Sequence, residues 1–301
     1  MTAVIEVQGL GKRYRRRWAL RDCTLSIPAG RVVGLVGVNG AGKSTLLHLV
    51  VGLLQPTTGT VSVLGDRPAA GPSALARVAF LAQDAPLYPS LTVAEHLELG
   101  RRLNGGWDHD VATARIAALG LVRDQPAGRL SGGQRAQLAL TMAIAKRPEL
   151  LVLDEPVASL DPLARRDFMQ GLMEAVAERD LTVVLSSHVL ADVERVCDHL
   201  VLLDDGRVRV AGDIDDLLAG HRLLTGARRH PCRLPTGQDV VEAHHTERQS
   251  RLLVRTGAPI HDPWWEVDEV GLEELVLAYM SGPGTGDRLR AADAPTAEAA
   301  R

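Results

Sequence analysis

The chain has 301 residues, of which 46% are hydrophobic and 24% are charged, and its formal net charge at pH 7 is −3. These values are ordinary for a soluble globular protein and give no global reason to expect nucleic-acid binding. No apolar run approaches the roughly 18–20 residues of a membrane span, the first residues lack a signal-peptide pattern, and the three scattered cysteines have no metal-binding spacing. We therefore expect one large domain and a smaller one, in a reducing compartment, in a chain that does not itself cross a membrane.

The N-terminal part of the chain predicts several strands and one buried helix. The alternating AVIEVQGL (3–10) and the turn-terminated CTLSI (23–27) predict two strands. The β-branched RVVGLVG (31–37) predicts a short strand that leads into a glycine loop. The stretch that follows, KSTLLHLVVGLL (43–54), is apolar nearly all round, as a buried helix is. QPTTGTVSVLGD (55–66) predicts a strand between two turns.

The middle of the chain alternates between helical patterns and apolar runs. Residues 86–147 are mainly helical in pattern and include Thr92-x-x-Glu95, the spacing of a capping box. LLVLDEP (150–156) and LTVVLSSH (181–188) are continuous apolar runs, typical of central strands in a parallel sheet that is covered on both faces. HLVLLDDGRVRVAGD (199–213) predicts a hairpin that turns at Asp205-Gly206.

The character of the sequence changes beyond residue 220. RLLTGARRHPCRLP (222–235) is expected to be irregular, whereas VVEAHHT (240–246) and SRLLVRT (250–256) are expected to pair as strands. LEELVLAYM (272–280) places five apolar side chains on one helical stripe. These elements predict a small appended α+β module.

The strongest chemical signal is GVNGAGKST at 37–45, a complete P-loop pattern between a predicted strand and a predicted helix. Glycines let backbone N–H groups curl around phosphates, and the helix N-terminus adds a favourable dipole. Only three of the 34 basic residues are lysines, yet Lys43 is one of them, and its compact charge suits the β- and γ-phosphates of a nucleotide. A glycine turn that precedes a helix by chance would not explain that lysine. The expected phosphate-binding residues are Gly37, Val38, Asn39, Gly40, Ala41, Gly42, Lys43, Ser44 and Thr45, with Ser44 also expected to ligate Mg²⁺.

Polar side chains end the two apolar runs that follow. Asp154 and Glu155 end the first run, and ligands of parallel sheets gather at the carboxyl ends of strands. We expect Asp154 to hold magnesium and Glu155 to polarise the attacking water as a general base. His188 ends the second run and is expected to contact the γ-phosphate. An acidic helix cap and a surface histidine are the plain alternatives, and the P-loop in the same chain favours the catalytic interpretation.

A second glycine-rich helix start lies in RLSGGQRAQLAL (129–140). Ser131 and Gln134 have the spacing of a capping box, which explains those two residues but not Gly132 and Gly133, since glycine costs a helix about 1 kcal/mol relative to alanine. Glycines at a helix start let an anion approach the backbone closely. Because Lys43 already serves one nucleotide, we expect the anion at this helix to belong to a nucleotide bound by a second chain. This predicts a head-to-tail pair that shares its nucleotides.

With these motifs in this order, the chain resembles the ATP-binding cassette (ABC) family over about residues 1–218, specifically a transporter's separate nucleotide-binding subunit. The resemblance implies an α/β P-loop NTPase fold with a RecA-like parallel-sheet core, an antiparallel β subdomain and a helical signature subdomain at about 85–145. A small C-terminal α+β accessory module at 219–281 and a disordered tail at 282–301 are expected to follow. The implied cofactors are ATP and Mg²⁺.

Further residues match family motifs. LSGGQ (130–134) matches the signature motif, and Ser159-Leu160-Asp161 matches the D-loop, which brings Asp161 to the nucleotide. Gln83 in FLAQD matches the Q-loop glutamine, which contacts Mg²⁺ and couples to the membrane partner. His188 matches the switch histidine. The departures are Val38 for the usual proline and Val157 for threonine, and neither replaces a group that the chemistry needs.

Tyr14 falls where the family stacks an aromatic ring on adenine. Trp18 competes for that role, and KRYRRRWAL (12–20) can alternatively be a basic surface strand with amphipathic aromatic residues. The cluster of Arg13, Arg15, Arg16 and Arg17 is expected to be a solvated basic face.

The resemblance implies an ATPase that powers transport at the cytoplasmic face of the membrane, as a peripheral subunit bound through its permease. Two cassettes, expected to form a homodimer, close on ATP and act on a separate transmembrane permease, with no nucleic-acid partner. We expect the permease to dock on the helical region, above all on PLYPSLTV (86–93). The C-terminal module resembles those of bacterial ABC-2-type exporters and predicts export of a drug, antibiotic or lipid-like compound.

Three alternatives remain: a soluble ABC ATPase that acts on nucleic acid or the ribosome, an importer ATPase, and a non-catalytic regulatory cassette. The single P-loop and the absence of long coiled-coil patterns count against the first alternative. Lys43 and Glu155 count against the last.

Overall fold

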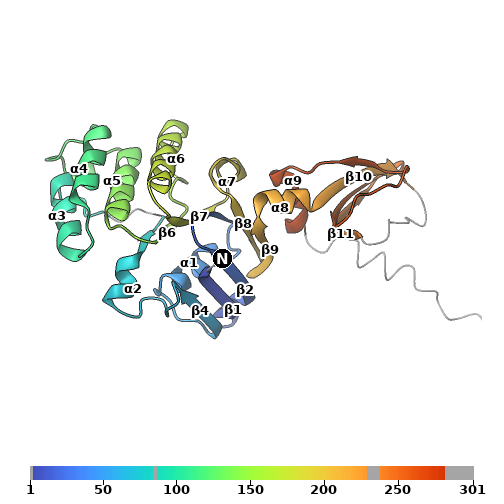
Figure 1. Cartoon of the computed structure of the whole chain (residues 1–301), viewed down its shortest axis with the longest axis horizontal. Coiled ribbons are helices and arrows are strands. Elements are labelled where there is room, and N and C mark those ends of the chain that lie inside the picture. The colour runs from blue at the N-terminus through green and yellow to red at the C-terminus, as the bar shows by residue number, and fades with distance from the viewer. Residues whose placement is uncertain (1–2, 84–86, 229–237, 282–301) are drawn as a thin grey trace, which may run out of the picture. The chain divides into compact units, whose positions relative to one another are not determined.

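The computed structural model describes residues 3–83, 87–228 and 238–281 (Figure 1). The chain divides into two compact units, Met1–Ala211 and Gly212–Arg301. The boundary predicted at 218/219 falls inside helix α8 (Ile214–Ala219). The predicted disordered tail lies outside the described residues.

A six-stranded sheet forms the centre of the first unit, in the order β5-β6-β7-β3-β8-β9. Its strands are β3 (Val32–Val36), β5 (Val78–Leu81), β6 (Leu150–Asp154), β7 (Thr182–Ser187), β8 (His199–Asp204) and β9 (Arg207–Asp213). The first five strands in this order, β5, β6, β7, β3 and β8, are parallel. Strands β3, β6 and β7 are buried along their whole length, as predicted for central strands. The segments that follow β3, β6 and β7 therefore meet at one edge of the sheet.

An antiparallel sheet in the order β2-β1-β4 lies beside the central sheet, and helices cover the other face. The antiparallel strands are β1 (Ala3–Tyr14), β2 (Arg17–Pro28) and β4 (Thr58–Val63). One hydrophobic cluster joins these strands and α1 (Lys43–Val50) to one set of sheet side chains, including those of Val33 and Val152. A second cluster packs α5 (Gly132–Ala145) and α6 (Pro162–Ala177) against the alternate set, including Leu151 and Leu185. The two-sided covering explains why these strands are apolar without alternation.

The β8–β9 hairpin turns at Asp205 and Gly206, as predicted, and both residues have left-handed φ angles, of 42° and 70°. The Gly206 N–H donates to the carbonyl oxygen of Ala41 at 3.1 Å, and the Gly206 carbonyl accepts from the Arg21 N–H at 2.7 Å. A Cβ atom on Gly206 would lie 2.6 Å from the carbonyl oxygen of Ala19. This turn therefore ties the glycine loop to strand β2.

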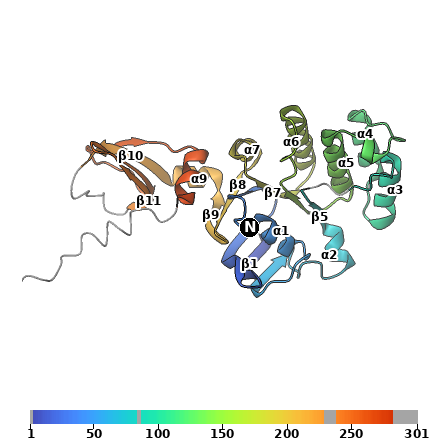
Figure 2. The same ribbon diagram turned by 180° about the vertical axis from the view of Figure 1, so that it is seen from behind.

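Helices α3 (Val93–Leu103), α4 (His109–Ala118) and α5 group together in both views of the first unit (Figures 1 and 2). They share a hydrophobic cluster that includes Leu97, Ile116 and Leu138. The predicted capping box at Thr92 is confirmed, because Thr92 Oγ1 accepts from the Glu95 N–H and the Glu95 carboxylate accepts from the Thr92 N–H. Helix α2 (Pro72–Arg77) and strand β5 were not predicted, since each is too short to show a period.

In the part of the second unit that the structure describes, an antiparallel sheet of four strands, in the order β11-β12-β10-β13, is accompanied by two helices. Its further elements are β10 (His221–Ala227), β11 (Gln238–His245), β12 (Gln249–Thr256), β13 (Glu266–Asp268) and α9 (Leu272–Met280). The predicted β11–β12 pair and the helix at 272–280 are confirmed. The prediction that 222–235 is irregular is wrong where the structure describes it, because 222–227 lie in β10. Leu223 and Leu224 pack into different hydrophobic clusters, so the strand shows no polar alternation.

Candidate functional site

The segment between β3 and α1 forms a tight loop whose glycines have close backbone neighbours. A Cβ atom on Gly37 would lie 2.2 Å from the carbonyl oxygen of Leu203, and one on Gly42 would lie 2.6 Å from that of Ala19. Gly42 also has a φ of 108°, which side-chain-bearing residues rarely adopt. The loop conformation therefore requires glycine at both positions, as the P-loop pattern predicts.

Helix α1 begins at Gly42 with no side chain that caps it and no acidic residue in its first turn. Helices α3, α4, α5, α6 and α8 each begin with a side-chain oxygen that accepts from a first-turn N–H, whereas α2, α7 (Leu190–Val196) and α9 resemble α1 in having no side-chain cap. The first N–H groups of a helix need an acceptor, and the helix dipole makes an anion the favoured one. The start of α1 thus fits a phosphate group.

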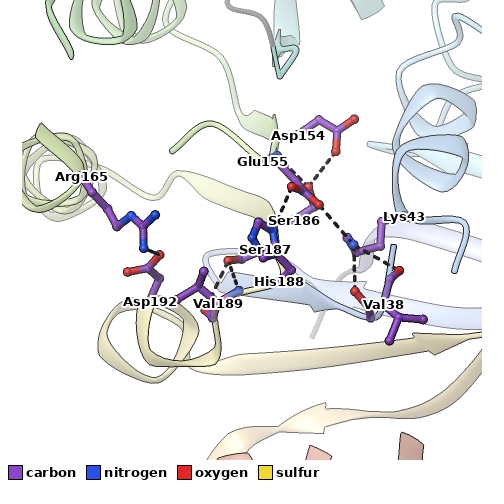
Figure 3. Close-up of polar contacts among 11 residues, drawn as sticks. Val38, Lys43, Asp154, Glu155, Arg165, Ser186, Ser187, His188, Val189 and Asp192 are labelled. Atoms are coloured by element: carbon purple, nitrogen blue, oxygen red, sulfur yellow. Dashed lines mark hydrogen bonds and ion pairs between the residues drawn. The ribbon is translucent and has the colours of Figure 1, made fainter. Parts of the chain in front are cut away.

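Lys43, Glu155 and His188 converge from three separate segments at this edge of the sheet (Figure 3). Lys43 Nζ lies 3.2 Å from Glu155 Oε1, and His188 Nδ1 lies 3.0 Å from Glu155 Oε2. Lys43 Nζ also donates to the carbonyl oxygen of Gly37 at 2.8 Å. The side chains of Lys43 and Glu155 are only 5% and 13% exposed, so solvent screens their attraction weakly. The Glu155 carboxylate thus bridges the lysine and the imidazole.

Ser186 connects the two acidic residues and was missed in the sequence. Its hydroxyl donates to Asp154 Oδ1 at 2.7 Å and accepts from the Glu155 N–H at 2.8 Å (Figure 3). Asp154 is buried, so the bond fixes one oxygen of a carboxylate that has little access to water. The available signal was the position of Ser186, beside Ser187 and two residues before His188, where an apolar run becomes polar.

Glu155 has a φ of 46°, in the left-handed region that is uncommon for residues other than glycine. Such backbone strain costs on the order of 1–3 kcal/mol and is concentrated at functional sites. The Ser186 hydroxyl holds the Glu155 N–H in this conformation. The strained backbone directs the carboxylate between Lys43 and His188.

Within one chain, structural contacts account for three of the four residues at the glycine-rich start of α5. Ser131 Oγ accepts from the Gln134 N–H at 3.2 Å, and Gln134 Oε1 accepts from the Ser131 N–H at 2.9 Å, which completes a capping box. A Cβ atom on Gly133 would lie 2.7 Å from the Cβ of Ala164, so close packing against α6 already requires this glycine. Gly132 is exposed, and a Cβ there would meet only Leu160, at 3.9 Å. Within one chain, only Gly132 is left without a structural reason.

Tyr14 and Trp18 lie on opposite faces of the β1–β2 hairpin. Tyr14 pairs with Arg17 and Arg13 pairs with Trp18, and successive residues of a strand alternate between faces. The Arg13 guanidinium lies over the Trp18 ring, 5.4 Å from its centroid, and Trp18 covers Gly11. Tyr14 is 46% exposed, with Lys12 Nζ 5.5 Å from its ring centroid. Of the two rings, Tyr14 is the one with an open face.

The remaining predicted residues do not join the Lys43–Glu155–His188 cluster in this chain. Asp161 caps α6, with Oδ1 accepting from the Leu163 and Ala164 N–H groups, and Gln83 is exposed. Helix α5, which begins at Gly132, lies with α3 and α4 and away from α1 in both views (Figures 1 and 2). In the P-loop, Val38, Asn39, Gly40 and Ser44 are exposed, whereas Ala41 is buried and Thr45 is half-buried.

Comparison with known proteins points to the same family as the motifs in the sequence. A family model described as ABC transporter matches residues 20–158. The aliphatic sulfonates import ATP-binding protein of Escherichia coli is 36% identical over 81% of this chain and 94% of its own length. The chain belongs to the ATP-binding subunits of ABC transporters. The Nod factor export ATP-binding protein I of Ralstonia nicotianae is 34% identical over 72% of this chain and 69% of its own length, and other relatives are named as molybdenum and nickel import proteins.

A solved structure described as the ATP binding subunit of an ABC transporter is 32% identical, with a TM-score of 0.64 over 72% of this chain and 92% of that one. The predicted fold class, an α/β P-loop NTPase of the ABC type, is therefore confirmed, as is the assignment as an ATPase. None of the helices that the structure describes is long and apolar enough to span a membrane.

Proposed function

We propose that this ABC ATPase binds MgATP between two copies of the chain and hydrolyses it to drive a separate membrane permease. The observation that carries the proposal is the Glu155 carboxylate held between Lys43 and His188, beside the uncapped start of α1. Lys43 and the loop at 37–45 would hold the β- and γ-phosphates. His188 would contact the γ-phosphate, and Glu155 would accept a proton from the attacking water.

The donor types of the three residues proposed to bind the metal fit magnesium. Asp154 supplies a carboxylate, Ser44 a hydroxyl and Gln83 an amide oxygen, which are the hard oxygen ligands that Mg²⁺ prefers. A magnesium ion bound there would neutralise phosphate charge. Ser186 would keep Asp154 oriented toward it.

The shared-nucleotide arrangement has support from the surface of the chain. Ser131, Gly132, Gln134 and Asp161 are exposed and belong to elements separate from α1. We propose that they contact the ATP held by the P-loop of a second copy, with Tyr14 stacked on the adenine. We further propose that the first unit, Met1–Ala211, is the ATP-binding domain and that the second unit, which begins at Gly212, contains the accessory module expected at 219–281.

The substitution Glu155→Gln tests the catalytic assignment. The variant should bind MgATP, lose nearly all turnover and accumulate as an ATP-bound dimer in size-exclusion chromatography. Glu178→Gln, which changes an exposed glutamate at the end of α6, is the matched control and should turn over like the unmodified chain. Turnover in Glu155→Gln equal to that of the control would remove Glu155 as the base.

We propose export as the direction of transport, as the sequence of the C-terminal module led us to expect, and a Nod factor export protein among the relatives supports this direction. Import is the second candidate, because sulfonate, molybdenum and nickel import proteins are among the relatives. The neighbouring reading frames distinguish the two directions. A gene for a permease of several membrane spans with no solute-binding protein beside it would support export, and a gene for such a binding protein would support import.

A further inference from the structure

The starts of α6 and α7 (Leu190–Val196) stand next to two residues of the proposed site. Asp161 caps α6, and Arg165 follows on the first turn, where its N–H donates to the Asp161 carbonyl at 2.9 Å. His188 precedes α7, and Asp192 lies on the first turn of that helix. Each helix thus carries a charged side chain one turn after a residue that the proposed function uses.

Arg165 and Asp192 face each other across these two helices (Figure 3). Arg165 Nη1 lies 3.7 Å from Asp192 Oδ2, and the Asp192 side chain is only 8% exposed. Arg165 Nε and Asp192 Oδ2 are buried, and among the described groups neither has a hydrogen-bond partner. A buried carboxylate without its countercharge is costly, so Asp192 depends on Arg165, whose side chain is 27% exposed. A shift of about 1 Å would bring the two groups to hydrogen-bond distance.

Helix α7 has few other polar attachments at its start. Its N-cap residue, Val189, has no side chain that can cap the helix, and its N–H donates to Ser187 Oγ at 3.0 Å. Val193, the residue after Asp192 in α7, packs closely on β3, since a Cβ atom on Gly34 would lie 2.4 Å from Val193 Cγ1. The ion pair with Arg165 is therefore placed to fix the first turn of α7 relative to α6.

We propose that the Arg165–Asp192 ion pair is a positioning contact that links the start of α6 to His188. When a second copy and its nucleotide press on Asp161, α6 carries Arg165 with it, and Asp192 transmits the shift to α7. The distance from His188 to Glu155 then depends on whether the partner is in place. This inference rests on the proposed function, because it assigns a route by which the shared site controls the Glu155–His188 contact.

The substitution Asp192→Asn tests the route, since it keeps the shape of the side chain and removes its charge. We expect kcat to fall about tenfold, with the KM for MgATP and the dimer formed in a Glu155→Gln background changed by less than about twofold. Asp192→Glu, which restores the carboxylate, should recover most of the lost kcat. Glu149→Gln breaks the exposed Arg77–Glu149 pair of the same unit and should leave kcat unchanged.

The outcomes separate the inference from the proposed function. An Asp192→Asn variant with unchanged kcat, in a chain that hydrolyses MgATP normally, would overturn the inference alone. The inference would also fail if nucleotide binding and melting temperature fell together with kcat, or if Asp192→Glu were as slow as Asp192→Asn, because the role would then be structural. Absence of MgATP hydrolysis in the unmodified chain would overturn the proposed function and the inference with it.

Discussion

The Ser186 hydroxyl donates to Asp154 Oδ1 across paired residues of the neighbouring strands β7 and β6. Ser186 Oγ also accepts from the backbone N–H of Glu155. One small side chain therefore fixes both the carboxylate proposed to hold magnesium and the strained backbone of the residue proposed as the base. Asp154 and Glu155 point in different directions, and the Ser186 side chain contacts both residues (Figure 3).

Removal of this hydroxyl should weaken the metal site more than the fold. Ser186→Ala leaves Asp154 with an unsatisfied oxygen, and loss of a group that orients a metal ligand typically costs about 10–100-fold in metal affinity or activity. We expect the Mg²⁺ concentration for half-maximal ATP turnover to rise, as measured by magnesium titration of the steady-state rate. Thr182→Val is a matched control at the other end of β7, because it removes a hydroxyl that accepts from the Gly30 N–H. An unchanged magnesium requirement in Ser186→Ala would show that Asp154 does not depend on this bond.

The sequence predicted the ends of the central strands well, because local chemistry determines them. Apolar runs that end in Asp154, Glu155 or His188 have few alternative structures, and the parallel arrangement of those strands brings their ends to one edge. The glycine spacing of the P-loop is equally local. Hence the amino-acid sequence is sufficient to predict that Lys43, Glu155 and His188 meet.

Other features depend on partners far away in the sequence. Ser186 acquires its importance only because β6 lies beside β7, and Gly133 only because Ala164 of α6 packs against it. Strand β10 was predicted to be irregular because its two adjacent leucines face different cores, which removes the alternating pattern. Strand β10 forms because it pairs with β12 and β13, and its own sequence carries no strand pattern.

The two glycines of the signature motif should respond differently to alanine. Gly133→Ala forces a Cβ to within 2.7 Å of Ala164, and overpacking of this kind costs about 1–3 kcal/mol. Gly132→Ala adds only an ordinary contact with Leu160, at 3.9 Å, and should stabilise the nucleotide-free chain by up to about 1 kcal/mol, since alanine favours the helix. Thermal unfolding without nucleotide checks both expectations.

The same pair of variants tests the shared site. In a Glu155→Gln background, Gly132→Ala should weaken the MgATP-dependent dimer seen by size-exclusion chromatography although the chain itself is more stable. A folding defect would lower both the stability of the chain and its dimerisation. A variant that is more stable but dimerises less has therefore lost a contact with the partner's nucleotide. If the Gly132→Ala chain dimerises like its parent, Gly132 does not contact the partner's nucleotide.

The second unit should lose stability in mild acid because of His221. Its Nδ1–H donates to the Leu217 carbonyl at 2.6 Å, and its Nε2 accepts from the Tyr279 hydroxyl at 2.9 Å. Burial lowers the pKa of His221, so the unfolded chain binds the proton more readily than the folded one. The contribution of His221 to stability is therefore complete above the unfolded value of about 6.5 and is lost as the pH falls through the lower folded pKa.

Hydrogen exchange of residues 238–281 between pH 7.5 and pH 5 measures this effect. Protection of this segment should decrease toward the acidic end of the range. His221→Gln should weaken the pH dependence, whereas His261→Gln, at an exposed position of the same unit, should leave it intact. Equal pH dependence in the two variants would mean that another group is responsible.

The turn at Gly206 limits how this chain can be altered by engineering or by evolution. Hairpin tips are usually where a protein accepts an inserted loop, a tag or a new cut point with least damage. Here both backbone groups of Gly206 are hydrogen-bonded. Its N–H donates to Ala41 of the P-loop, and its carbonyl oxygen accepts from Arg21 of the antiparallel sheet. Lengthening this tip would release the support of the phosphate-binding segment itself, so sequence drift and peptide insertions should be rarer here than at the exposed tip of the β1–β2 hairpin.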